Sequence, residues 1–396
     1  MATRPGQQQP QGAQIPLENF ELPQFPAQAR GLLALTLTST IKLEEYPSLL
    51  EKPFVVPALP SSIQSLTLEL FPLGYPPGFL VRLIDELPDL KSLVVYNQLI
   101  CGTTPASQVD AVEFFEKALG LRSLHLLDVY APPPFWDRVA VGFRARERGL
   151  MFLEVNYSSR HEDEGMLTRI ACDELPLLVT PSLISCSFNV SVPDPTADKT
   201  SNLKQGEASI EGPSKGVIAF DTSKSSVLVQ ALTDEETYPR ALKALNTTLY
   251  TLKLPQLRTL LAKHKGLMVL NATLELEPTT AFKAELLGMI MLCSSLEQVE
   301  IVGSPTEEFH RAAITNDKLL QDASPSQEDI VILAKKCEKL TSFKVNLLRA
   351  TRWPSIEWKK HGEQWEGGVT LQMEPAESAR EVKGSKKKSE AWSPWT

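Results

Sequence analysis

The residues of this sequence that could carry out chemistry are few and widely separated. Its five histidines are His125, His161, His264, His310 and His361. The stretch RHEDEG at 160–165 places His161 beside Glu162, Asp163 and Glu164, a set that could bind a metal ion if the fold supplied further ligands. An acidic loop in contact with solvent needs no such additional ligands. We therefore favour a surface loop over a metal site for this stretch.

Sequence motifs of known catalytic sites are also absent. The chain contains no G-x-G-x-x-G, G-x-x-x-x-G-K-[ST], H-E-x-x-H or G-x-S-x-G. No pair of its five cysteines has the C-x-x-C spacing of a zinc knuckle or a redox pair. The sequence therefore offers no nucleophile or base, and we expect a protein that is not an enzyme and that uses no cofactor and no metal ion.

Composition and charge restrict the class of protein further. Of the 396 residues, 42% are hydrophobic and 22% are charged, which is typical of a folded globular chain. The net charge is −8 without long blocks of one sign, which disfavours nucleic acid as a partner. The N-terminus lacks the apolar core of a signal peptide, and the most apolar window, 286–293, is too short to cross a membrane. These features predict a cytoplasmic protein with no membrane contact.

A short apolar spacing recurs along the chain and predicts its fold. The pattern apolar-x-x-apolar-x-apolar occurs ten times, beginning at Leu32, Ile63, Leu90, Leu121, Leu150, Leu183, Leu249, Leu267, Leu296 and Leu340. The first five intervals are 31, 27, 31, 29 and 33 residues, which is too regular for chance and indicates a structural repeat. The interval of 66 residues before Leu249 predicts a hidden repeat near 216–220 and an inserted loop. The next interval is only 18 residues, so one of its two matches is expected not to be a strand.

The segments between these matches carry helical patterns. Residues 79–87 place their apolar side chains on one helical face, and residues 109–119 do the same with Val109, Val112, Phe115 and Leu119. Before the last match, Ser324 is predicted as the N-cap of a helix, with Pro325 at its first position and Gln327 completing a capping box. Each repeat is therefore predicted to be a short strand followed by a helix of about ten residues.

Such units must stack to bury their apolar faces. Helices are wider, at ~10 Å, than the ~4.8 Å strand spacing, so a stack of parallel strands joined by helices curves. These repeats resemble leucine-rich repeats of the long, ribonuclease-inhibitor-like type, and the chain resembles F-box-associated repeat proteins, although no F-box is visible. The resemblance covers about residues 31–350, but the Asn or Cys usual eight positions after the first leucine is missing. It implies an α/β solenoid, or horseshoe, with parallel strands on the concave face and helices on the convex face.

Flexible segments are expected at both ends and within this solenoid. Residues 1–30 are rich in Gln, Pro and Ala and predict a flexible N-terminal segment, followed by a single solenoid over 31–375. The polar stretch 193–216 predicts a disordered insertion, and 376–396 a disordered basic tail. The lysine run 386–388 could direct the chain to the nucleus, although we favour a solvated tail. Trp392 and Trp395 in that tail could dock on the body of the protein, dock on a partner, or be incidental.

The predicted concave face contains one apolar region. Most of its side chains are small and polar, as a solvated sheet face requires. The exceptions lie on three consecutive strands: Val94, Tyr96, Leu127 and Phe152, next to His125 and Glu154. Exposed aromatic groups with a polar rim are typical of binding interfaces. These six residues are the predicted partner-binding site, unless an N-terminal segment or the 193–216 insertion covers them, an alternative that we hold open.

The function that follows is binding rather than catalysis. We expect a monomeric protein-interaction scaffold or adaptor that binds a protein partner of unknown identity through its concave face. The alternative is an enzyme or a pathway accessory factor with a site in the irregular C-terminal half, 193–375. A third possibility is an adaptor that has lost an F-box.

Overall fold

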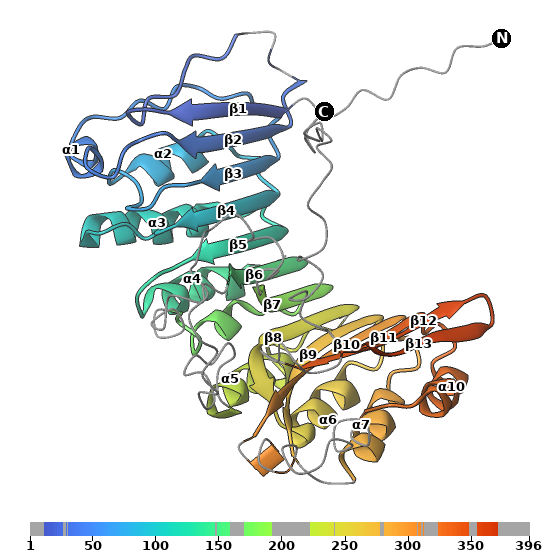
Figure 1. Cartoon of the computed structure of the whole chain (residues 1–396). Helices are drawn as coiled ribbons and strands as arrows, with labels where there is room; N and C mark the ends of the chain where they lie inside the picture. The colour runs from blue at the N-terminus through green and yellow to red at the C-terminus, as the bar shows by residue number, and fades with distance from the viewer. Residues whose placement is uncertain are drawn as a thin grey trace, which may run out of the picture.

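The computed structural model contains one open sheet with helices along one of its faces (Figure 1). It describes residues 12–26, 29, 31–146, 149–158, 170–191, 222–240, 242–277, 281–306, 308–309, 312, 324–347 and 355–370. Thirteen strands follow one another in sequence order. Their bounds are β1 Gly12–Leu17, β2 Ala34–Ser39, β3 Ser65–Glu69, β4 Ser92–Gln98, β5 Ser123–Val129, β6 Phe152–Ser158, β7 Ser185–Ser191, β8 Ala244–Leu252, β9 Val269–Leu276, β10 Gln298–Pro305, β11 Ser342–Leu347, β12 Ser355–His361 and β13 Gln364–Thr370.

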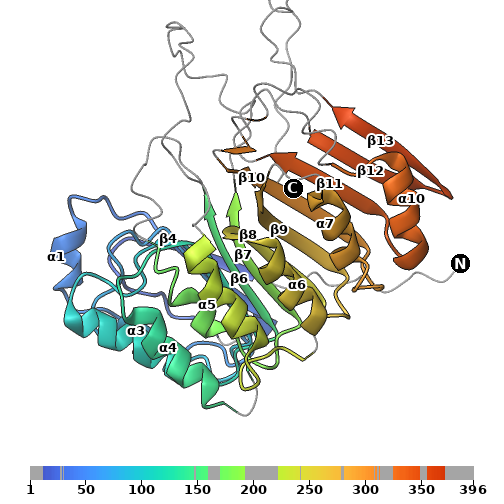
Figure 2. The same ribbon diagram turned by 90° about the horizontal axis from the view of Figure 1, so that it is seen from below.

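Helices connect most of these strands and pack side by side on one face of the sheet (Figures 1 and 2). They are α1 Tyr46–Leu50, α2 Phe79–Asp85, α3 Pro105–Lys117, α4 Phe135–Arg144, the 3₁₀ helix η3 Leu175–Leu178, α5 Thr222–Thr233, α6 Leu254–Lys263, α7 Phe282–Ile290 and α10 Gln327–Lys336. No helix in the described ranges has the length and hydropathy needed to cross a bilayer. The predicted alternation of short strands and helices is therefore present.

A repeated backbone arrangement joins the units. Just before each strand from β3 to β11, two consecutive N–H groups donate to the same carbonyl oxygen of the preceding unit, at 2.7–3.3 Å. For example, Arg122 and Ser123 both donate to the carbonyl of Lys91. The strands from β1 to β11 are parallel, and β12 and β13 close the sheet as an antiparallel hairpin. The two N–H groups at the entry of each strand from β3 to β11 therefore have a hydrogen-bond partner.

The core lies between the sheet and the helices. In most of the strands, alternate residues point to the helices and are buried, such as Leu93 and Val95 in β4 and Leu124 and Leu126 in β5. The other residues lie on the opposite surface, which we call the open face. No described helix covers the open face, whereas parallel sheets are usually covered on both sides. The open face must therefore be polar, or be covered by a partner or by another part of the chain.

Several expectations from the sequence differ from this structure. Residues 12–17 form β1 and Phe20 is fully buried, although 1–30 was expected to be flexible, because these side chains fill the end of the core beside Tyr46 and Phe79. Strand β7 pairs directly with β8, and residues 216–220, where a hidden repeat was predicted, lie outside the described residues. The stretches 193–216 and 376–396, with Trp392 and Trp395, lie outside the described residues.

The sheet changes direction between β7 and β8 (Figure 1). These two strands pair over only three residues, from Ser185 with Ala244 to Ser187 with Asn246. Beyond Thr247, β8 carries a bulge before it resumes pairing with β9 at Thr251. Bulges bend strands and increase their twist, which accounts for the different inclinations of β1–β7 and β8–β13.

Candidate functional site

The predicted partner-binding residues lie together on the open face of three neighbouring strands. Strands β4, β5 and β6 are paired in register, so that their outward side chains form a grid of three rows. We call this grid the β4–β6 patch. Its rows are Ser92, Ser123 and Phe152, then Val94, His125 and Glu154, then Tyr96, Leu127 and Asn156. All six predicted residues belong to it, and what the patch binds is the subject of the proposals below.

Exposed aromatic side chains distinguish this patch from the rest of the described surface. Tyr96 is 39% exposed and Phe152 is 43% exposed, and they are the only exposed aromatic residues among those that the structure describes. Val94 and Leu127 lie half-buried between them. From the strand spacing and the rise per residue, the Cα atoms of Tyr96 and Phe152 are about 16 Å apart. The two aromatic rings therefore lie at opposite corners of a surface that one partner segment could span.

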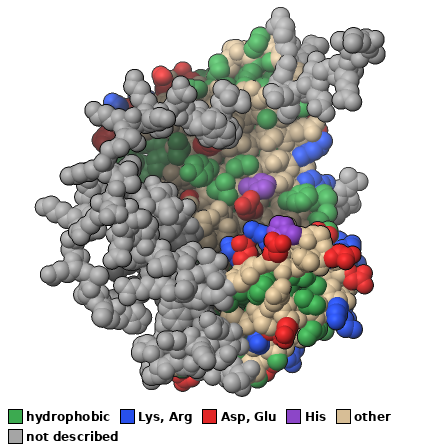
Figure 3. Space-filling view, turned by 45° about the vertical axis from the view of Figure 1, so that its right-hand side comes forward, with side chains coloured by type: hydrophobic (Ala, Val, Ile, Leu, Met, Phe, Trp, Pro, Cys, Tyr) green, Lys and Arg blue, Asp and Glu red, His purple; other side chains and the backbone are tan. Residues whose placement is uncertain are grey.

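The centre of the patch is a hydrogen-bonded chain of three side chains. His125 Nδ1 lies 2.7 Å from Glu154 Oε2, and His125 Nε2 lies 2.7 Å from Ser123 Oγ. Hydrogen bonding to His125 lowers the pKa of Glu154, so this carboxylate is ionised at neutral pH. An ionised carboxylate accepts only, so Nδ1 carries a proton, and in the neutral imidazole Nε2 is the acceptor for the Ser123 hydroxyl. Figure 3 shows histidine and acidic side chains among hydrophobic ones on this surface.

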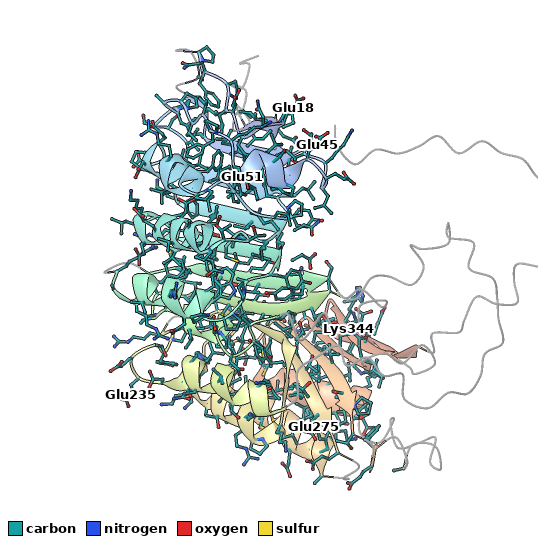
Figure 4. All side chains as sticks on the ribbon, turned by 90° about the vertical axis from the view of Figure 1, so that its left-hand side faces the viewer. Glu18, Glu45, Glu51, Glu235, Glu275 and Lys344 are labelled. Atoms are coloured by element: carbon teal, nitrogen blue, oxygen red, sulfur yellow. The ribbon has the colours of Figure 1, made fainter. Side chains whose placement is uncertain are left out.

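Polar networks occupy the open face from Asn156, at the edge of the patch, towards β11. Ser191 donates to Asn156 Oδ1 at 2.9 Å, and Thr248 Oγ1 lies 2.6 Å from Asn189 Oδ1 beside the bulge in β8. Towards the other end of the sheet, Lys344, labelled in Figure 4, forms an ion pair with Glu300 at 3.1 Å. On these other strands, paired polar groups occupy the open face instead of exposed aromatic side chains. The apolar surface of the open face is therefore concentrated at β4–β6.

One member of the central chain was missed by the sequence analysis. Ser123 was treated only as one of many small polar residues, although S-x-H on a strand places both side chains on one face. His125 and Glu154 are 29 residues apart, the same as the interval between Leu121 and Leu150. This match to the repeat places them at paired positions on adjacent strands, as the structure shows. The sequence therefore contained a signal for this hydrogen-bonded chain, but finding it required the repeat interval to be applied to polar as well as apolar residues.

Elsewhere among the described residues, the candidate sites have fewer groups that could take part in a reaction or bind a metal ion. The described residues contain no group of three or more His, Cys, Asp and Glu side chains placed to hold a metal ion. The acidic stretch 160–165 lies outside the described residues. A cavity of about 870 Å³ near α1 and the start of α3 is lined by Pro47, Phe54, Pro76 and Thr104, among others. It presents mainly proline, aliphatic and hydroxyl groups, with no histidine or cysteine in its lining.

No protein-family model matches the chain, and no curated protein matches its sequence.

Proposed function

We propose that this chain is a protein-interaction scaffold or adaptor, a leucine-rich-repeat-like solenoid that binds a partner protein through its concave, open face. The single observation that carries the proposal is the exposure of Tyr96 on β4 and Phe152 on β6, on the same face of the sheet and on either side of β5. The strand–helix units and their repeated backbone hydrogen bonds support the solenoid. Large aromatic side chains that remain exposed in a folded chain are typical anchors of binding energy.

The chemistry around these anchors indicates what kind of partner segment fits. Glu69 lies beside Tyr96 across β3 and β4 and has no ion-pair partner among the described residues. A partner that brings apolar side chains to Tyr96 and Phe152 and a lysine or arginine to Glu69 would complement both features. We therefore expect binding that depends on the two aromatic rings and weakens moderately as salt concentration rises.

The test is affinity purification with quantitative mass spectrometry, followed by titration with the recovered partner. The intact chain is compared with the double variant Tyr96→Ser/Phe152→Ser. The matched control is Leu119→Ser/Val141→Ser, which replaces two exposed apolar side chains outside the open face. Losses of about 1–2 kcal/mol for each anchor predict at least about 30-fold weaker binding for the double variant alone.

Two results would contradict the proposal. If a purified partner bound the double variant as tightly as it bound the intact chain, the β4–β6 patch would not be its binding site. If the double variant unfolded at much lower urea concentration than the control, the patch would instead be covered by another part of the chain. Deletion of 193–216 then tests that alternative, because removal of a segment that covers the patch would lower the free energy of unfolding, as the double variant does.

A further inference from the structure

The proton positions in the central chain of the patch match those of a nucleophilic serine site. Glu154 accepts from Nδ1 of His125, so the lone pair on Nε2 faces the hydroxyl of Ser123 at 2.7 Å. A general base within 2.6–3.2 Å of a hydroxyl, itself oriented by a third group, is the arrangement that activates serine. Geometry and roles, rather than sequence position, identify such a site.

This arrangement occurs at one serine in a row of serines. Ser65, Ser92, Ser123 and Ser185 occupy the same row of the open face, on β3, β4, β5 and β7. Two positions further along each strand, the residues are Thr67, Val94, His125 and Ser187. Among these four serines, only Ser123 has a base on its own strand, and this base has a carboxylate at the paired position of the next strand. Ser342 on β11 extends the row and has Lys344 two positions further on, but that lysine is engaged in an ion pair with Glu300.

We propose that Ser123, His125 and Glu154 form a nucleophilic triad that cleaves carboxylic esters with an apolar acyl group. Ser123 Oγ attacks the ester carbonyl carbon while its proton moves to His125 Nε2, and that proton then leaves with the departing alcohol as the ester C–O bond breaks. Water next gives a proton to Nε2 and attacks the acyl carbon. The bond from this carbon to Oγ breaks, the proton returns to Oγ, and a carboxylic acid is released.

The surroundings of Ser123 define the substrate class. Phe152 lies at the paired position on β6, and Val94 occupies the position paired with His125 on β4. Leu127 follows His125 on the same face of β5. An acyl chain bonded to Ser123 Oγ would therefore lie against three apolar side chains, which favours apolar over charged acyl groups.

The backbone limits how fast such a site can work. The N–H of Ser123 donates to the Lys91 carbonyl at 3.0 Å, so it is not available to stabilise an oxyanion. The Ser92 hydroxyl, on the neighbouring strand, is the nearest candidate donor by register. Oxyanion-hole donors contribute a factor of about 10²–10³ each to the rate. We therefore expect slow turnover, and covalent labelling is the more sensitive measurement.

The experiment measures the labelling of the purified full-length chain by an alkyl fluorophosphonate. The phosphorus bonds to a serine oxygen, fluoride leaves, and the serine proton is released to solvent. Tryptic mass spectrometry then locates the adduct. We expect labelling at Ser123, its complete loss in Ser123→Ala, and a loss of at least about 100-fold in His125→Ala. Glu154→Gln should slow the labelling by about 10-fold or more, because the oriented proton on Nδ1 is lost.

Matched controls separate activation from simple exposure. Ser65→Ala and Ser185→Ala change serines of the same row without the histidine and should leave labelling unchanged. Hydrolysis of p-nitrophenyl butyrate should follow the same order of variants. The proposal is overturned if Ser123 is labelled no faster than Ser65 and Ser185, or if His125→Ala reacts like the intact chain while its circular dichroism is unchanged. Neither result bears on partner binding through Tyr96 and Phe152, so the two proposals fail independently.

Discussion

The contact between helices α2 and α3 gives a sharp test of the architecture that positions the patch. Asp110 of α3 accepts hydrogen bonds from the N–H groups of Leu80 and Val81, each at 3.0 Å, in the first turn of α2. The N-cap of α2 is Gly78, which has no side chain to make these bonds. A carboxylate from the next repeat therefore performs the role that an N-cap side chain usually has.

The size of the effect follows from the burial of this contact. Asp110 is 5% exposed and Leu80 is 1% exposed, so water cannot replace the carboxylate without opening the helix layer. Loss of an N-cap costs about 1 kcal/mol, and leaving a buried donor without a partner costs about 1–3 kcal/mol. We expect Asp110→Ala to lower the free energy of unfolding by about 3 kcal/mol. Asp110→Asn should lower it by about half as much, because one acceptor oxygen remains.

Urea unfolding monitored by circular dichroism measures these differences. Glu116→Ala is the control, because Glu116 is an exposed residue of the same helix and its loss should change stability by less than about 0.5 kcal/mol. If Asp110→Ala proved as stable as this control, Asp110 would not cap α2, and the contact described between α2 and α3 would be refuted.

Two further predictions concern buried polar groups elsewhere in the repeats. Burial lowers the pKa of His264 to about 4, and its Nε2 donates to the Leu232 carbonyl at 3.1 Å. As the pH falls, the His264 imidazole therefore takes up a proton in the unfolded chain before it does so in the folded chain. The free energy of unfolding should keep its full value above about pH 6.5 and fall by about 3 kcal/mol as the pH drops to about 4. Urea unfolding at several pH values should show this loss in the intact chain, and a smaller one in His264→Gln. Tyr46 donates to the Gly74 carbonyl at 2.8 Å, and Tyr46→Phe should cost about 1–2 kcal/mol in the same assay at neutral pH, whereas an unchanged midpoint would refute the contact.

The repeat spacing predicted most of the strands, and its failure at β8 has a physical cause. The pattern matched at Leu249, but β8 begins at Ala244, in register with Ser185 and Val269. The position equivalent to the third apolar residue is Thr247, which is fully buried. A pattern restricted to apolar residues cannot detect a buried threonine, so the start of this unit at Leu242 was missed.

The helices were predicted with less accuracy than the strands. Residues 79–87 form α2 and its C-terminal turn with the expected apolar side chains buried. In α3, however, Val109 and Leu119 are exposed, and Phe114 and Ala111 are buried beside Phe115. Helix α3 ends at Lys117, so Leu119 lies outside the helix and is not part of its buried face. The helix is also rotated about its axis relative to the prediction, so that Asp110 points to α2. Contacts between repeats determine this rotation, and they cannot be inferred from the apolar periodicity of one helix.

The N-terminus of α10 shows a smaller error of the same kind. Ser324 was predicted as its N-cap, but Ser326 is the cap, with its hydroxyl accepting from the N–H of Asp329 at 3.2 Å. Both serines fit the pattern of a cap three residues before an acidic or amide side chain. The structure selects Ser326, because Pro325 lies before the helix and its carbonyl accepts from the indole N–H of Trp358 at 3.2 Å.

We propose that the β4–β6 patch binds a protein partner, and calorimetric titration measures that binding. The purified partner is titrated into the intact chain, into Tyr96→Ser/Phe152→Ser and into Leu119→Ser/Val141→Ser under identical salt conditions. We predict a Kd at least about 30-fold higher for the patch variant, with the control within about twofold of the intact chain. Equal Kd values for all three proteins would contradict the claim.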